Sequence, residues 1–236
     1  MNVVRKVAIM QPYIFPYFGY WQLLNVVDTF IIYDDVNFIK RGWVNRNNIL
    51  NNGKPSMFTI PLIKASQNKL INEINIVSDN LWKQKLLKTI VASYKKAPYF
   101  NAVYPMIEEI INNNETNISV YIEFQLKKIA TYLNITTTIK IASKEYNNRR
   151  LKGQERILDI CIKEKASQYI NPIGGLDLYE KDKFIENGLK LNFINSKNIE
   201  YKQFKNNFVP FLSIIDLLMF NSIEEIKEKL VEFTLV

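Results

Sequence analysis

The strongest structural signal lies near the start of the chain, where a strand, a loop, a helix and a second strand follow one another. Residues 3–10 form a continuous apolar and β-branched run that is typical of a buried strand. Residues 19–27 have the pattern of a helix, and residues 30–33 form a second short apolar strand. Two strands joined in this way are expected to be parallel, with a right-handed crossover.

Alternating strand and helix patterns continue to the end of the chain and predict an α/β fold with a mostly parallel sheet. Further strands are predicted at residues 58–63, 71–77, 136–141, 169–170 and 189–194. Helices are predicted at residues 81–97, 102–111, 119–133, 153–165, 181–187 and 212–219, with a last helix opened by a capping box at Ser222 and Glu225. We therefore expect a helical middle region and a helical C-terminus. No internal repeat or linker interrupts residues 1–236, so we expect a single domain.

The composition excludes several kinds of chemistry. The chain has no histidine, which rules out Ser-His-Asp and Cys-His catalysis and histidine-based zinc sites. It has one cysteine, no signal-peptide pattern and no apolar run long enough to span a bilayer, which together favour the cytoplasm. The net charge of +8 is spread along amphipathic segments, so a small anionic substrate or an acidic protein is a better expected partner than nucleic acid.

The densest polar cluster follows the second strand, in residues 34–47. Ligands of open α/β sheets bind at the carboxyl ends of strands, where this cluster lies. It opens with the paired acids Asp34 and Asp35. Its candidate substrate-binding residues are Lys40, Arg41, Trp43, Asn45, Arg46 and Asn47. The cations can pair with phosphate oxygens and the tryptophan can stack on a base or sugar, although a solvated charged loop has a similar composition.

An aromatic loop, residues 11–20, follows the first strand and leads into a helix. Its candidate residues are Gln11, Tyr13, Tyr17 and Tyr20, and the helix start supplies free N–H groups that suit an anion. Residues 17–20 also share the spacing of the His-x-Gly-His element of the nucleotidyltransferase superfamily, with tyrosine in place of both histidines. The strand–helix–strand unit is therefore predicted to be nucleotidyltransferase-like. The alternative is ordinary aromatic core packing.

Two other features are weaker. The paired glycines Gly174 and Gly175 would let a ligand approach the backbone, but they also suit a plain turn. Cys161 lies in an apolar helical stretch and is expected to be a core residue rather than a nucleophile. The chain contains no CxxC, P-loop or GxGxxG motif, and we expect neither a cofactor nor a metal.

Long segments of the chain resemble the WbqC-like family of bacterial proteins. The matching segments are AIMQPYIFPYFGYWQLL, DTFIIYDDVNFIKRGWVNRNNIL, SYKKAPYF, GQERILDIC, YINPIGGLDLYEKDKF, GLKLNF and NNFVPFLSIIDLLMFN. The resemblance implies a place in surface-polysaccharide and O-antigen biosynthesis. It also implies an enzyme that modifies or transfers nucleotide-linked sugars, with acyl or aminoacyl transfer to an amino sugar as one possibility.

These observations lead to a first hypothesis and two rivals. The first is a transferase that N-acylates or aminoacylates a nucleotide-linked amino sugar, with Asp34, Asp35 and Tyr20 as catalytic candidates and an acidic acyl-carrier protein as a candidate partner. The second is a nucleotidyltransferase-like enzyme or a glycosyltransferase, in which the two acids would hold a divalent metal. The third is a non-catalytic binding module of the same pathway. The sugar, the nucleotide, the donor and the oligomeric state do not follow from the sequence.

Overall fold

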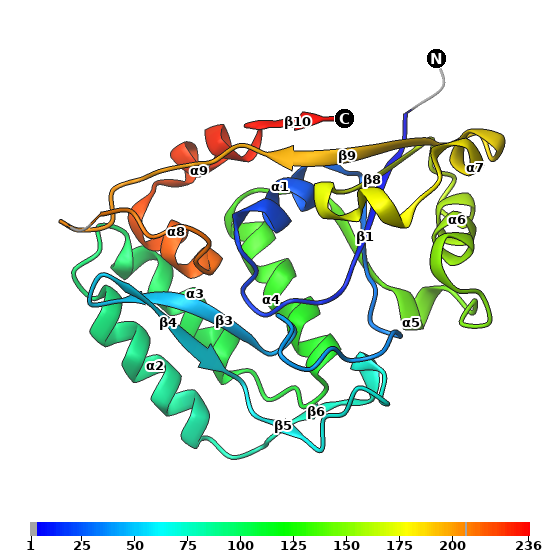
Figure 1. Ribbon diagram of the computed structural model, residues 1–236. Coiled ribbons are helices and arrows are strands. Elements are labelled where there is room, and N and C mark those ends of the chain that lie inside the picture. Colours follow the sequence, from blue (N-terminus) through cyan, green and yellow to red (C-terminus); the bar gives the residue numbers. More distant parts are fainter. Residues whose placement is uncertain (1–3, 206) are drawn as a thin grey trace.

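A six-stranded sheet forms the centre of the structure (Figure 1). The computed structural model describes residues 4–205 and 207–236. In spatial order the strands are β10 (Phe233–Leu235), β9 (Lys190–Ser196), β8 (Gln168–Pro172), β1 (Lys6–Met10), β2 (Thr29–Ile32) and β7 (Thr138–Ile141). Strands β9 to β7 are parallel, and β10 pairs antiparallel with β9 at the edge. The predicted α/β class with a mostly parallel sheet is confirmed.

The N-terminal unit has the predicted strand–helix–strand arrangement. Strand β1 leads through a loop into helix α1 (Phe18–Val26), and β2 returns parallel to β1 in a register from Val7 opposite Thr29 to Met10 opposite Ile32. The side chains of successive β1 residues pack into different cores. Ala8 packs on the sheet face that α1 covers, and Val7 and Ile9 pack on the opposite face. The apolar run of this strand is continuous because both of its faces are buried.

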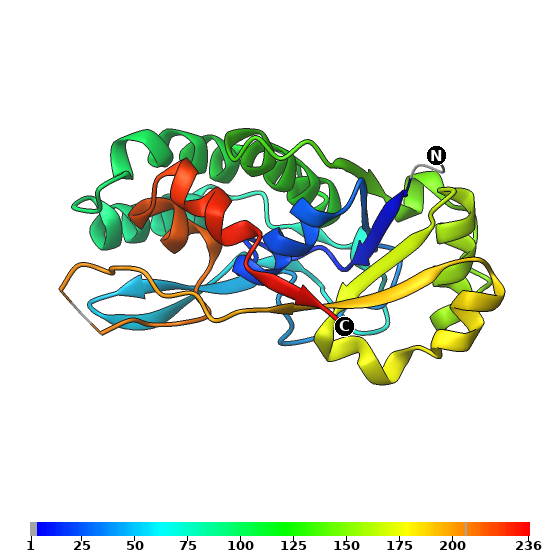
Figure 2. The same cartoon turned by 90° about the horizontal axis from the view of Figure 1, so that it is seen from above.

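Helices cover both faces of the sheet, and Figure 2 shows this layering from above. The larger core contains α1, α4 (Ile118–Tyr132), α8 (Ile214–Phe220) and α9 (Ile223–Leu230), and the smaller core contains α6 (Gly153–Lys163) and α7 (Lys181–Glu186). Along the chain the sheet grows from β1 through β2 to β7, and then from β8 to β10 on the other side of β1. This reversal between β1 and β8 creates the crevice where open α/β sheets bind ligands.

The middle of the chain is helical, as predicted, and it packs beside a hairpin that the sequence analysis missed. Helices α2 (Leu81–Tyr94) and α3 (Phe100–Asn112) precede α4, and the short helix α5 (Ala142–Glu145) follows β7. The hairpin consists of β3 (Arg46–Asn51) and β4 (Lys54–Thr59). Its turn residues Asn52 and Gly53 have φ angles of 49° and 73°, which is the Asn-Gly pattern of a tight hairpin turn.

Two predicted strands are confirmed only in part. Residues 71–77 form the 3₁₀ helix η1 (Ile71–Glu73) and the short strand β6 (Asn75–Ile76), because the Glu73 carboxylate accepts a hydrogen bond from the Leu70 N–H and closes a turn there. Residues 58–63 divide between the end of β4 and the short strand β5 (Leu62–Ile63). The capping box at Ser222 and Glu225 is confirmed, although β10 follows the last helix. Within the described residues, no helix combines the length and apolarity needed to cross a lipid bilayer.

Candidate functional site

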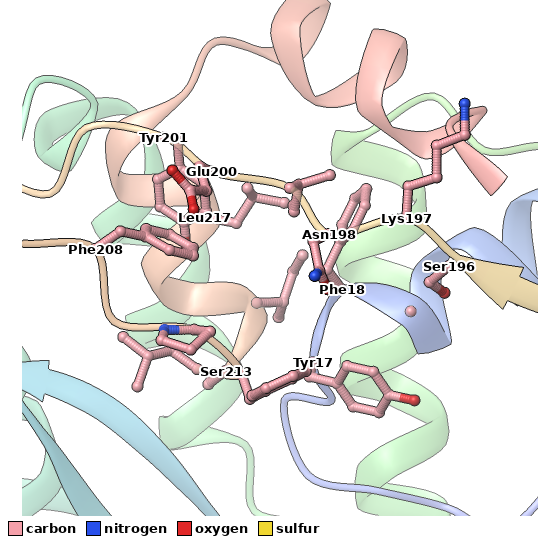
Figure 3. A pocket seen from close by; sticks show the side chains of 16 residues that line it. Tyr17, Phe18, Ser196, Lys197, Asn198, Glu200, Tyr201, Phe208, Ser213 and Leu217 are labelled. Atoms are coloured by element: carbon pink, nitrogen blue, oxygen red, sulfur yellow. The ribbon is translucent and has the colours of Figure 1, made fainter. Parts of the chain in front are cut away.

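A cleft with two cavities lies beside the start of α1, at the carboxyl edge of the sheet. The first, here called the Trp43 cavity, has a volume of about 330 Å³. It is lined by Tyr13, Pro16, Tyr17, Trp43, Asn47, Asn48 and Phe211. The second, here called the Leu217 cavity, has a volume of about 350 Å³ and lies between the start of α1, the segment after β9 and helix α8 (Figure 3). Tyr17 and Phe211 line both cavities and therefore form the boundary between them.

The Trp43 cavity joins the two loops that the sequence analysis selected. The Ile14 N–H donates to the Trp43 carbonyl at 3.1 Å. The Asn47 side chain donates to the carbonyls of Ile14 and Phe15, at 3.1 and 2.8 Å, and its own carbonyl oxygen accepts from the Asn48 N–H. Both bonds donated by this buried amide thus join the polar loop to the aromatic loop.

The backbone around this cavity is strained at bulky residues. Phe15, Arg41 and Phe211 have φ angles of 40°, 63° and 57°, in the left-handed region that such side chains avoid. Phe15 is held there by Asn47 and by a bond from its own N–H to the Gln125 side chain at 2.8 Å. Backbone strain of this kind clusters at functional sites, where the surrounding structure maintains it.

The basic residues of the polar loop divide into two groups. Lys40 and Arg41 are exposed, and neither forms an ion pair with any residue of the described ranges. The Arg46 guanidinium instead donates to the carbonyls of Gly42 and Arg41, and it lies 5.9 Å from the centre of the Trp43 ring. Arg46 therefore positions the loop, whereas the charges of Lys40 and Arg41 are open to a ligand.

Asp34 is buried and lies at the end of β2 rather than in either cavity. Its carboxylate accepts hydrogen bonds from the Ser119 hydroxyl at 2.9 Å and from the Ser143 hydroxyl and N–H at 2.6 and 2.9 Å. Burial raises the pKa of Asp34 above the ordinary value, and these bonds oppose that rise. The bonds join β2 to α4 and α5, which favours a structural role.

Asp35 is also buried, and it forms a 2.5 Å ion pair with Arg156 of α6. The Arg156 guanidinium also donates to the Asn148 side chain and lies over the Tyr33 ring, 4.7 Å from its centre. One Asp35 oxygen has no hydrogen-bond partner among the described residues. The catalytic role assigned to the two acids from the sequence stays a prediction, and their surroundings favour a role in attaching the helices to the sheet.

The tyrosines of the aromatic loop differ in their access to the cleft. Tyr20 is 2% exposed and its hydroxyl donates to the Gln11 carbonyl at 3.1 Å, whereas Tyr17 is 41% exposed. Burial raises the pKa of Tyr13 and of Tyr17, and it raises that of Tyr20 well above the ordinary value. All three hydroxyls are therefore protonated donors at neutral pH.

The remaining candidates lie away from the two cavities. Gly174 and Gly175 belong to the 3₁₀ helix η2 (Ile173–Leu178) after β8, and a Cβ atom at Gly175 would come within 1.9 Å of the Asn171 side chain. Asn45 donates from its side chain to the Ile60 carbonyl at 2.8 Å. Cys161 is buried, as predicted, and burial raises the pKa of its thiol to about 12.

One wall of the cleft, formed by residues 196–205 and 207–212, was not predicted from the sequence. A buried carboxylate on α8 anchors this wall: Asp216 accepts hydrogen bonds from Tyr201 at 2.7 Å and from Gln203 at 2.6 Å, and from Tyr94 of α2 at 2.9 Å. Gln203 in turn bonds both the N–H and the carbonyl of Val209. The proline-aromatic run at residues 208–211 resembles the composition of the first loop and is the signal that could have revealed this wall.

The similarity to known proteins extends over the segments that form both cavities. The model of the WbqC-like protein family matches residues 11–228, which include both cavities. A Mycobacterium tuberculosis protein, the uncharacterized protein Rv1507c, is 28% identical over 219 residues, which cover 91% of this chain and 93% of the relative. No solved structure gives a significant match.

Proposed function

The chain belongs to the WbqC-like protein family, and on that premise we propose that it is a transferase acting on a nucleotide-linked amino sugar. The proposed reaction is acyl or aminoacyl transfer to the sugar amine, in the biosynthesis of bacterial surface polysaccharide in the cytoplasm. The observation that carries the proposal is the pair of cavities that meet at Tyr17 and Phe211. A transferase must hold a donor and an acceptor side by side, and adjoining cavities allow this.

The Trp43 cavity has the features expected of a site for the nucleotide-linked sugar. The Trp43 ring is 42% exposed and can stack on a sugar or base, and Tyr13 lines the same cavity. The half-buried amide of Asn48 can bond sugar hydroxyls. Lys40 and Arg41, which precede Trp43 in the polar loop and form no ion pair with a described residue, would bind the diphosphate. Arg46 and Asn47 would act by positioning these groups.

The proposed chemistry is nucleophilic attack of the sugar amine on an activated acyl carbon. A C–N bond forms, the bond from the acyl carbon to the leaving group breaks, and the amine proton departs with the leaving group. Tyr17 lies at the boundary of the cavities, and its hydroxyl, whose pKa is raised by burial, can donate to the developing oxyanion. In the first turn of α1 the Tyr20 N–H already donates to the Tyr17 carbonyl at 3.1 Å, so the Gly19 N–H is the group of this turn that we assign to the same stabilisation. The mechanism invokes no metal and no cofactor.

An acidic carrier protein remains the proposed source of the acyl group. The chain carries a net charge of +8. Helix α2 and the two residues that follow it contribute exposed lysines at Lys85, Lys88, Lys95 and Lys96, and none of them forms an ion pair with a described residue. A positively charged surface attracts a negatively charged partner, and the attraction is strongest at low ionic strength.

A nucleotidyltransferase-like activity is the second candidate, and the sheet topology favours it. The strand order has the reversal beside β1 that is typical of nucleotide-binding α/β sheets, and α1 begins at that edge. Against it, Tyr20 takes the place of the second histidine of the superfamily element, and its buried hydroxyl already donates to Gln11. A neutral tyrosine cannot supply a cation to a phosphate.

The test is a turnover assay on the purified protein. Amino sugars linked to uridine, thymidine or guanosine diphosphate are incubated with acyl or aminoacyl thioesters, and mass spectrometry follows the sugar nucleotide. We expect its mass to increase by the acyl group, and we expect Tyr17→Phe to lower turnover by about 100-fold with little change in affinity for the sugar nucleotide. Release of pyrophosphate or of free nucleoside diphosphate would favour the second candidate, and binding without any product would leave only a binding module.

A further inference from the structure

The walls of the Leu217 cavity are built from apolar and aromatic side chains. They come from three separate segments and include Phe18, Ile199, Tyr201, Phe208, Leu212 and Leu217. The floor belongs to α8, where Ile214 and Leu217 are at most 2% exposed. Figure 3 shows the rings of Tyr201 and Phe208 on one side of the cavity and that of Tyr17 across from them. A volume of about 350 Å³ is within the range of small-molecule sites, which begins at roughly 300 Å³.

The charged residues that line this cavity are exposed to solvent. Among the described lining residues the charged ones are Lys197 and Glu200, and both are exposed. Figure 3 shows the Lys197 side chain extending away from the other labelled residues. A phosphate or carboxylate placed against the apolar floor would lose its hydration without gaining a partner, which is costly. The interior therefore favours an uncharged, apolar occupant.

The mouth of the cavity lies where the proposed reaction would take place. Tyr17 and Phe211 are shared with the Trp43 cavity. Ser196 at the end of β9 approaches α1 so closely that a Cβ atom at Gly19 would lie 3.0 Å from its hydroxyl oxygen. An acyl chain in this cavity would thus have its carbonyl beside Tyr17 and the start of α1, facing the neighbouring cavity.

Hydrogen bonds within the protein hold the described part of this wall in place. The buried Asp216 carboxylate bonds Tyr201 and Gln203, and Gln203 bonds Val209 in both directions. Residues that are already held in place lose little conformational entropy when a ligand binds. Less of the free energy gained by burying the apolar chain is then spent on ordering the wall.

We propose that the Leu217 cavity is the acyl-chain site and that it holds the apolar part of the acyl donor while the sugar occupies the Trp43 cavity. This inference rests on the transferase proposal, which it deepens by naming an uncharged aliphatic or aromatic acyl group as the donor class.

The experiment measures binding of S-acyl-N-acetylcysteamine thioesters with acyl chains of two to ten carbons. Because each buried methylene contributes about 0.8 kcal/mol, affinity should rise about fourfold per added carbon until the cavity is full. Ile199→Trp places a large ring in the cavity and should weaken the longest thioester more than tenfold. Asn198→Trp, at an exposed position that lines the cavity, should do the same with little risk to folding. The matched control is Ile162→Trp on the exposed side of α6, which should bind like wild type.

Titrations with a nucleotide-linked amino sugar separate this inference from the proposed function. Unchanged sugar-nucleotide affinity in all three variants is expected. Thioester affinity that is independent of chain length, or equal in the cavity variants and the control, would overturn the acyl-chain site even if the sugar nucleotide binds. A loss of sugar-nucleotide affinity in Ile199→Trp would also overturn it, because the cavity would then hold the base. A chain-length dependence without sugar-nucleotide binding would contradict the proposed function and leave the apolar site standing.

Discussion

At the residue scale, Asp34 and Asp35 show how the same side chains fit two different roles. Adjacent acids at the end of a strand are typical of a catalytic or metal site, and the sequence analysis chose them for that reason. In the structure Asp34 is bonded by Ser119 and Ser143, and Asp35 is paired with Arg156. Their partners lie 85 to 121 positions away along the chain, so no local pattern could have revealed them.

The first prediction distinguishes these roles by substitution. Asp35→Asn leaves the Arg156 charge buried without its partner, and we expect a loss of about 3–5 kcal/mol in the free energy of unfolding. Asp34→Asn should also lower the melting temperature, because an amide cannot accept all the bonds from the two serines. In both variants the protein that remains folded should keep its specific activity. A variant with wild-type stability and no turnover would restore the catalytic role.

The second prediction concerns the charge of Arg41. The φ angle of Arg41 is 63°, and asparagine tolerates this backbone, so Arg41→Asn removes the charged guanidinium without straining the loop. We expect sugar-nucleotide binding to weaken by about 1.5–3 kcal/mol and to become less sensitive to salt. Lys165→Asn is the control, since it makes the same change at another left-handed, exposed position after α6. Equal effects of the two substitutions on binding would remove Arg41 from the site.

At the scale of elements, the regular helices and the parallel strands were predicted, and the irregular pieces were not. Periodicity located α1, α2, α4 and α6 to within a few residues, because their apolar faces are continuous in sequence. Strand β3 was missed because residues 46–48 carry only polar side chains, although the Asn52-Gly53 turn marks a hairpin. The wall at residues 196–205 and 207–212 was missed because side-chain hydrogen bonds to Asp216 and Val209, rather than a repeating pattern, hold it in place.

The third prediction tests how β3 is joined to the aromatic loop. Asn47→Asp places a carboxylate against the carbonyls of Ile14 and Phe15 and removes both donated bonds. We expect the free energy of unfolding to fall by at least about 1–3 kcal/mol, as for a buried group left unsatisfied. The same substitution at the other end of the strand, Asn51→Asp, should be nearly neutral, because Asn51 is half-buried and lies opposite Lys54. Comparable losses for the two variants in chemical denaturation would contradict this account.

At the scale of the whole molecule, Glu164 joins distant parts of the smaller core. Its buried carboxylate pairs with Arg5 before β1 at 2.9 Å and with Lys140 of β7 at 2.6 Å, and it accepts a bond from the Tyr146 hydroxyl. Burial acts to raise the pKa of Glu164, but its hydrogen bonds with Lys140 and Tyr146 and the neighbouring positive charges outweigh burial, so the net shift is downward.

The fourth prediction follows from the sign of that shift. A carboxyl group with a lowered pKa in the folded state adds stability at pH values above its unfolded pKa. That stability is lost as the pH falls through the folded pKa. We expect Glu164→Gln to destabilise the protein at neutral pH by about 1.5–3 kcal/mol and to flatten the loss of melting temperature below about pH 4.5. Glu228→Gln on the exposed side of α9 should keep the wild-type profile. Parallel acid profiles for wild type and Glu164→Gln would contradict the assignment.

The central claim is that the cleft beside α1 binds a nucleotide-linked sugar through the exposed ring of Trp43. Its most direct test is an equilibrium titration of nucleotide diphosphate-linked amino sugars into wild type, Trp43→Ala and the control Leu178→Ala, which truncates an exposed apolar side chain on η2. We predict that Trp43→Ala weakens binding by about 1–3 kcal/mol, as the loss of one stacking ring does, with an unchanged melting temperature. Leu178→Ala should bind like wild type. Equal affinities for wild type and both variants would contradict the claim and place the sugar elsewhere.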